Sequence, residues 1–305
     1  MNELTKAQLA RASTPGGFLV LTFAVISGVL LCVGLGIEPD EIQKWIDKRS
    51  EVAFATLVLI LVVAVVAIDQ LTAMLAPLAL RAYSGSWIPD GKIREKLVKR
   101  RVDRASKADR EWRDSIEQSP KDRSKQSLLY LDLKWRTTDE TIQAPFRIGE
   151  IMNVGQARSS LKFGITLDTA LRHLELFVDS EAQERQDTKA KSVLLIAQAS
   201  MISLLTLPLI CHFWPVVFVP ILVFFGVRLV LPARIRTYFD GAEALVDTYR
   251  IDLYKQLGFA APPDDAKVEI PYGNALENFV RGGRVTAPLE RSEQKETGAS
   301  EDPDE

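Results

Sequence analysis

Residues 192–231, with the sequence SVLLIAQASMISLLTLPLIC-HFWP-VVFVPILVFFGVRLVL, decide the fold class. The run Ser192–Cys211 carries no formal charge, and at about 1.5 Å per residue it spans roughly 30 Å, the thickness of a bilayer core. The shorter run Val216–Leu231 is extended by the aromatic residues Phe213 and Trp214, which favour the headgroup region of a membrane. The pattern predicts two membrane helices that fold back on each other.

The rest of the chain repeats this contrast between apolar and charged stretches. The hydrophobic content of 47% and the net charge of −2 are averages over two kinds of segment, apolar runs and stretches rich in charged residues. Gly17–Ile37 has no charge and no closing cleavage pattern, and Val52–Leu80 is interrupted only by Asp69 and Gln70. Seven Lys or Arg stand against two acidic residues between Arg81 and Arg101, so this side is expected in the cytoplasm.

The predicted fold class is an all-α membrane protein with four transmembrane helices in two hairpins, a mainly helical cytoplasmic region and helical extensions of the membrane helices. Both termini are expected inside, in a multi-pass protein of the inner (plasma) membrane. The predicted division is a cytoplasmic N-terminus (1–16), a first membrane helix (17–37), an external loop (38–51), a second membrane helix (52–80), a basic helical cytoplasmic region (81–190), a third membrane helix (191–211), an external turn (212–215), a fourth membrane helix (216–231), a cytoplasmic amphipathic helix (232–258) and a disordered acidic tail (259–305).

Apart from Lys191 at the edge of the third crossing, Asp69 and Arg228 are the only formal charges inside the predicted crossings, and both fall in the cytoplasmic half. An ionisable residue in a membrane is a functional candidate, here a charge pair or part of an ion path. The alternative is that Arg228 reaches the interface with its long side chain and that Asp69 is hydrated there.

A stripe of small residues in the first predicted helix is a candidate helix-packing face. It consists of Ala24, Gly28, Cys32 and Gly36, which recur every four residues and would let another helix approach closely in lipid. The alternative is that small residues are simply common in such helices. Cys32 and Cys211 are the only cysteines, and His173 and His212 the only histidines, so neither a disulfide framework nor a metal site is expected.

A basic amphipathic helix is predicted over Lys92–Arg113. Its candidate lipid-facing residues are Lys92, Lys96, Lys99, Arg100, Arg101 and Arg104. A helix of this kind binds anionic lipid or nucleic acid, or is an ordinary positive-inside flank with a solvated face. Nucleic acid is not expected, because aromatic residues are not interleaved with the basic ones and no recognisable binding motif is present.

Three further expectations concern the cytoplasmic part. Leu128–Trp135 alternates like a short strand, and Pro145–Arg158 is expected to be a helix in which Arg147 binds a phosphate-bearing ligand or forms a structural hydrogen bond. Asp179, Ser180 and Gln183 resemble a capping box that opens a helix continuing into the membrane. The apolar stripe from Ile235 to Leu257 is expected to pair with residues 180–190 as a stalk.

Several short motifs resemble a family of uncharacterised bacterial four-span inner-membrane proteins. They are Tyr83-Ser-Gly-Ser-Trp87-Ile-Pro89 (W-I-P), Pro145-Phe-Arg147-Ile-Gly149-Glu150 (P-x-R-x-G), Phe163-Gly164, and Tyr238–Leu257 with Asp247-Thr-Tyr249-Arg250 (D-x-Y-R-x-x-L). The similarity covers Val52 to Pro262, with Glu150 where the family usually has Asn. It implies the four-span topology and carries no activity.

Three function classes follow from these observations. The favoured hypothesis is a non-enzymatic membrane protein whose cytoplasmic region binds a protein partner or self-associates, as a scaffold or signalling component. The alternative is a subunit of an oligomeric channel, pore or transporter, based on Asp69, Arg228 and the small-residue stripe. An enzyme is least expected, since no metalloprotease, P-loop or nucleophile-elbow motif is present, and no cofactor is predicted.

Overall fold

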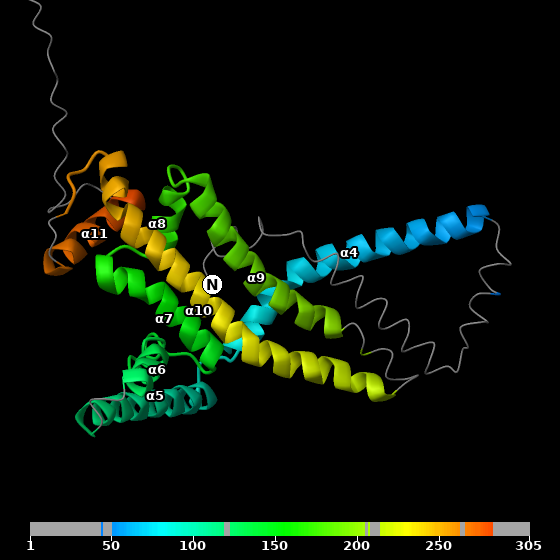
Figure 1. Ribbon diagram of the computed structural model, residues 1–305, viewed down its shortest axis with the longest axis horizontal. Coiled ribbons are helices and arrows are strands. Elements are labelled where there is room, and N and C mark those ends of the chain that lie inside the picture. Colours follow the sequence, from blue (N-terminus) through cyan, green and yellow to red (C-terminus); the bar gives the residue numbers. More distant parts are fainter. Residues whose placement is uncertain are drawn as a thin grey trace, which may run out of the picture. The chain divides into compact units, whose positions relative to one another are not determined.

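The computed structural model describes residue 44 and residues 51–118, 123–204, 207, 214–262 and 266–282 (Figure 1). Within these ranges the regular elements are α-helices and one short 3-10 helix, without strands. They are α4 (Glu51–Ser84), α5 (Lys92–Gln118), α6 (Arg123–Leu133), α7 (Arg147–Phe163), α8 (Leu167–Leu174), α9 (Ser180–Leu204), the 3-10 helix η2 (Trp214–Val217), α10 (Phe218–Gln256) and α11 (Ala266–Val280). The predicted all-α class is confirmed for the described residues.

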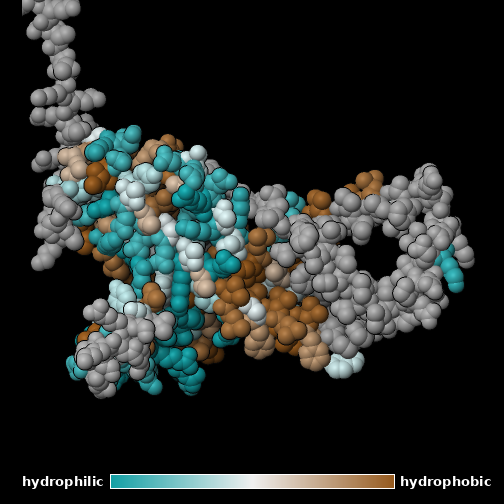
Figure 2. Space-filling model, in the orientation of Figure 1, coloured by the Kyte–Doolittle hydropathy of each residue, from teal (hydrophilic) through white to brown (hydrophobic). Residues whose placement is uncertain are grey.

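One described helix, α10, is long and apolar enough to cross a membrane. Large apolar side chains remain exposed along its first half, and Figure 2 shows apolar side chains gathered on this part of the surface. They are Phe218, Ile221, Leu222, Phe224, Phe225, Leu229 and Val230. The predicted crossings at 52–80 and 191–211 fall on α4 and, as far as Leu204, on the end of α9. Residues 17–37 with their small-residue stripe, and residues 208–211, lie outside the described ranges.

The chain divides into two compact units, the first made of residues 1–156 and 179–241 and the second of residues 157–178 and 242–305. In the first unit α4 packs against α9. The α4 side chains of Thr72, Ala76 and Ala79 are buried on one face, while Met74 and Leu78 are exposed on the other. Because the buried residues are small, the two helices can approach closely.

One end of the first unit is built where α7, α9 and α10 meet. A Cβ atom at Gly155 of α7 would lie 2.4 Å from the Phe239 ring of α10, so only glycine allows this contact. The Gln186 side chain of α9 donates a hydrogen bond to the Tyr238 carbonyl of α10 at 3.1 Å. The predicted partnership between residues 180–190 and the amphipathic helix is therefore confirmed in this unit.

The second unit packs α11 onto the chain around Gly164. Thr166 caps α8 by accepting a hydrogen bond from the Thr169 amide, and both threonine hydroxyls donate to the buried Glu277 carboxylate of α11 at 2.9 Å. Phe259 and Phe279 meet edge to face with ring centroids 5.0 Å apart. Glu269 of α11 accepts a hydrogen bond from Arg250 of α10 at 2.6 Å.

Two expectations about local structure were wrong. Leu128–Trp135 is not a strand, because α6 covers it as far as Leu133 and packs on α5 through Trp112 and Tyr130, whose ring centroids are 6.0 Å apart. The tail 259–305 is not disordered throughout, because 266–280 form α11; residues 283–305 lie outside the described ranges. Three predicted helices agree with the structure, since α7 begins at Arg147, α9 at Ser180 and α10 ends at Gln256.

Candidate functional site

The carboxylate of Glu150 is the centre of a buried charge cluster at the start of α7. Its side chain is only 1% exposed and forms ion pairs with Arg101 of α5 and, at 2.8 Å, with Arg147. The Gln143 amide also donates to it at 3.3 Å. Glu150 therefore joins α5, α7 and the loop before α7, and it has an amide and two guanidinium groups as donors.

Asp132 at the end of α6 is the second carboxylate of this cluster. It accepts hydrogen bonds from Arg136 at 2.7 Å and from Arg147 at 2.8 Å, and Arg236 of α10 lies 3.4 Å away. Burial on its own would raise the pKa of the Asp132 carboxyl, but the hydrogen bond from Arg136 and the positive charges of the three arginines outweigh it and lower the pKa below the ordinary value.

Four arginines thus surround two carboxylates, namely Arg101, Arg136, Arg147 and Arg236 around Asp132 and Glu150. Desolvation lowers the pKa of Arg101 and of Arg236. The guanidinium of Arg147 is fully used, since it also donates to the Trp135 carbonyl at 2.8 Å. Of the two interpretations of Arg147, the structural one is confirmed, because its hydrogen bonds connect α6 to α7.

The neighbouring W-I-P and P-x-R-x-G stretches form the corner between α4 and α7. Gly85 has a positive φ of 77° beside Phe146, and the Trp87 indole donates to the Ala82 carbonyl at 3.2 Å. A Cβ atom at Gly149 would lie 2.3 Å from the Ser84 carbonyl oxygen. These two glycines allow the first turn of α7 to lie directly against the end of α4.

Asp69 lies at the joint between α4 and α9 and is buried. Its carboxylate accepts a hydrogen bond from the Gln198 amide of α9 at 2.7 Å, and the same amide lies 3.1 Å from the Thr72 hydroxyl. The side chains of Asp69 and Arg228 form no ion pair with each other. Gln198 was missed by sequence reasoning, although an uncharged amide inside the apolar run Ser192–Cys211 is the signal that would have found it.

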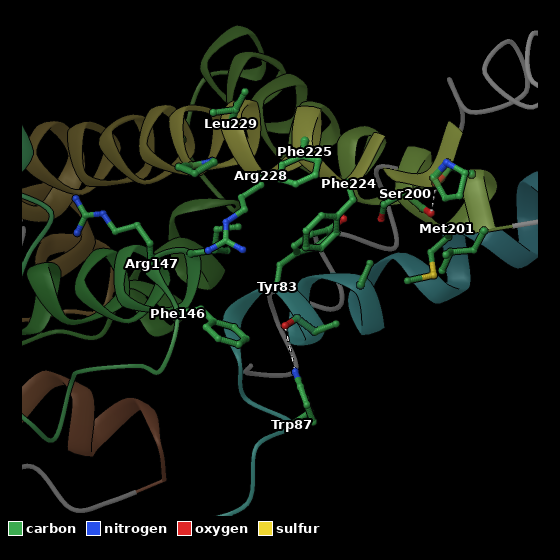
Figure 3. A pocket seen from close by; sticks show the side chains of 17 residues that line it. Tyr83, Trp87, Phe146, Arg147, Ser200, Met201, Phe224, Phe225, Arg228 and Leu229 are labelled. Atoms are coloured by element: carbon green, nitrogen blue, oxygen red, sulfur yellow. Dashed lines mark hydrogen bonds between the residues drawn. The ribbon is translucent and has the colours of Figure 1, made fainter. Parts of the chain in front are cut away.

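Arg228 lies instead in the wall of a cavity of about 810 Å³ between the ends of α4 and α9, the first turn of α7 and the apolar half of α10. Figure 3 shows its side chain pointing from α10 into this cavity, whereas the guanidinium of Arg147 points away from it. Among the described residues no carboxylate pairs with Arg228, and none belongs to the cavity wall. The rest of the wall is mainly apolar, and its aromatic residues are Tyr83, Trp87, Phe146, Phe224 and Phe225.

The basic residues predicted on α5 divide into two groups. Lys92, Lys96, Lys99, Arg100 and Arg104 are exposed along the helix. Arg101 does not belong to this face, because its side chain is only 11% exposed and pairs with Glu150. Ala105, on the opposite face of α5, is buried, and the carbonyl of Ser115 near the end of the helix accepts a hydrogen bond from Gln126 of α6.

The described residues place no group of three His, Cys, Asp or Glu side chains where they could hold a metal ion. Comparisons of the chain with protein-family models, curated proteins and solved structures give no match. The function is therefore inferred from the geometry of the chain itself.

Proposed function

We propose that the chain is a non-enzymatic integral protein of the inner membrane, with four membrane helices in two hairpins and both termini in the cytoplasm. Its cytoplasmic helical region binds a second protein or a second copy of the chain, so the protein acts as a scaffold or a signalling component. The continuity of α10 is the observation that carries this proposal.

Within the first unit, the apolar part of α10 continues into its charged part without a break in the helix. The helix continues through Pro232 from an exposed apolar surface to residues that are fixed by ion pairs. Asp240 pairs with Lys134 at 2.9 Å, and Arg236 lies 3.4 Å from Asp132. We infer that a displacement of the apolar half would reach the arginine cluster, because both lie on one uninterrupted helix.

The exposed basic face of α5, formed by Lys92, Lys96, Lys99, Arg100 and Arg104, is the surface we assign to the partner. It is presented by a helix whose other face is held in the first unit, and so it is rigid. A rigid basic surface selects an acidic partner and increases its rate of association.

Purification in a mild detergent tests this assignment through the mass of the particle. We expect a detergent-corrected mass of at least two chains of 34.0 kDa each, or one that includes a second protein in a fixed ratio. The triple variant Lys96→Glu, Lys99→Glu, Arg100→Glu should fall to the mass of one chain, because like charges across an interface repel.

A matched control reverses three scattered charges, Arg172→Glu, Arg185→Glu and Lys255→Glu, whose side chains are exposed. The two triple variants have the same net charge, so only the position of the substitutions differs. The control should keep the mass of the unmodified particle. A single chain without a second protein in the unmodified sample would contradict the proposal.

A further inference from the structure

We propose that the cavity beside Arg228 binds an anionic phospholipid of the cytoplasmic leaflet, with its phosphate on Arg228 and an acyl chain along the first half of α10. This inference rests on the proposed membrane location of α10. It assigns a ligand to the protein. The lipid composition of the membrane would then affect α10, the helix that reaches the arginine cluster.

The charge of the cavity wall selects the headgroup. Among the described residues of the wall, the charged ones are Arg147 and Arg228, and the guanidinium of Arg147 is occupied by Asp132, Glu150 and the Trp135 carbonyl. Arg228 remains with its hydrogen-bond donors available at the cavity. An arginine fork matches the oxygen atoms of a phosphate group, and the first turn of α7, at Phe146 and Arg147, adds the positive end of a helix dipole to the same cavity.

The shape of the cavity selects a ligand with an apolar tail. Along α10 its wall extends from Pro220 to Pro232, which corresponds to about 18 Å of helix. From Arg228 towards Pro220 the α10 residues of the wall are the apolar Phe224 and Phe225. The helix α9 adds Met201 and Leu204, together with Ser200 and Ser203, whose hydroxyls donate to carbonyl groups of their own helix. The volume of about 810 Å³ lies within the roughly 300–1,000 Å³ of small-molecule pockets.

The polarity of the cavity also agrees with the proposed topology. Arg228 lies three residues before Leu231, where the apolar run ends, so its guanidinium is near the cytoplasmic headgroups. The apolar part of the wall continues towards the middle of the bilayer. A phospholipid of the inner leaflet has the same order, with the phosphate at the surface and the chains inside.

Native mass spectrometry of the full chain in detergent, after lipid removal, tests the assignment. The probes are dioleoylphosphatidylglycerol, dioleoylphosphatidylcholine with the same chains but no net charge, and glycerol phosphate without chains. We expect phosphatidylglycerol to bind at least about tenfold more tightly than phosphatidylcholine, and glycerol phosphate not to bind. Arg228→Gln should remove this preference, whereas Arg228→Lys should retain part of it, because lysine keeps the charge but not the fork.

Two further variants locate the ligand. Arg234→Gln makes the same change on the same helix at an exposed position outside the cavity wall, and it should leave the preference unchanged. Ala82→Phe adds a ring at an exposed residue of the wall and should weaken both phospholipids by a similar factor, because it occupies the space of the acyl chain.

Equal binding of the two phospholipids, an unchanged preference in Arg228→Gln, or no effect of Ala82→Phe would each overturn the assignment. Tight binding of glycerol phosphate would identify a soluble phosphate compound as the ligand. An absence of binding of all three probes would overturn the assignment as well. Lipid binding is read as the mass of lipid added per chain, whatever the number of chains in the particle, so its failure is distinct from a failure of the partner surface on α5, which is measured by particle mass.

Discussion

Replacing Glu150 by Gln should destabilise the first unit by about 3–5 kcal/mol, the usual cost of removing one partner of a buried ion pair. The substitution keeps the volume of the side chain but removes the charge that Arg101 and Arg147 share. Arg101, only 11% exposed, would then remain as a buried cation without its carboxylate. Thermal unfolding of the full chain in detergent, followed by circular dichroism, should show a decrease in Tm of roughly 6–20 °C.

The control for this prediction is Glu181→Gln. Glu181 pairs with Arg185 on α9, but its side chain is 75% exposed, and such pairs contribute only about 0–1 kcal/mol. A second comparison is the double variant Arg101→Met, Glu150→Leu, which should recover part of the loss because neither charge is left alone. Equal Tm values for Glu150→Gln and Glu181→Gln would show that the arginine cluster does not hold the first unit together.

Replacing Gly273 by Ala should release α11 from the second unit. A Cβ atom there would lie 1.8 Å from the Phe163 carbonyl oxygen and 2.8 Å from its carbonyl carbon. These are backbone atoms, so the clash cannot be relieved by a change of rotamer, and the cost should reach at least the usual 1–3 kcal/mol of an overpacked site. Limited proteolysis with mass spectrometry should detect cleavage in 257–282 at least about fivefold faster, since 1.4 kcal/mol corresponds to a factor of ten and 1 kcal/mol to a factor of about five.

The sign of this result separates packing from helix propensity. Alanine favours an isolated helix over glycine by up to about 1 kcal/mol, so propensity alone would stabilise α11. The matched control is Gly226→Ala in α10, where a Cβ atom would meet nothing within 4 Å and should cause no loss. If Gly273→Ala resists the protease as well as the unmodified chain, α11 does not lie against Phe163.

Features that depend on neighbouring residues were predictable from the sequence. Three such features act within a few helical turns. The proline at 145 marks the start of α7, the capping residues near Ser180 mark the start of α9, and the apolar period from Ile235 to Leu253 marks the second half of α10. The alternation in Leu128–Trp135 covers only eight residues, too few to separate a strand from a helix that packs through one side.

The contacts that make up the candidate site could not be predicted in the same way. Asp69 and Gln198 are 129 positions apart, and Arg101 and Glu150 are 49 apart, so their pairing depends on how helices pack and not on local periodicity. The helix α11 was missed because part of its docking comes from close backbone approach at Gly273 and from the Glu277 carboxylate. A count of large apolar residues does not register such contacts.

If α10 passes from lipid into the cytoplasm as one helix, single-cysteine labelling along it should show three different patterns of access. In a background with Cys32 and Cys211 replaced by Ser, Trp214→Cys, Leu222→Cys and Thr237→Cys each place one thiol at an exposed position. With a membrane-impermeant maleimide, Trp214→Cys should react in intact cells and Thr237→Cys only after permeabilisation. Leu222→Cys should react in neither case, because lipid excludes the water-soluble reagent. Reaction of Leu222→Cys at the rate of Thr237→Cys, or of Thr237→Cys in intact cells, would contradict the account.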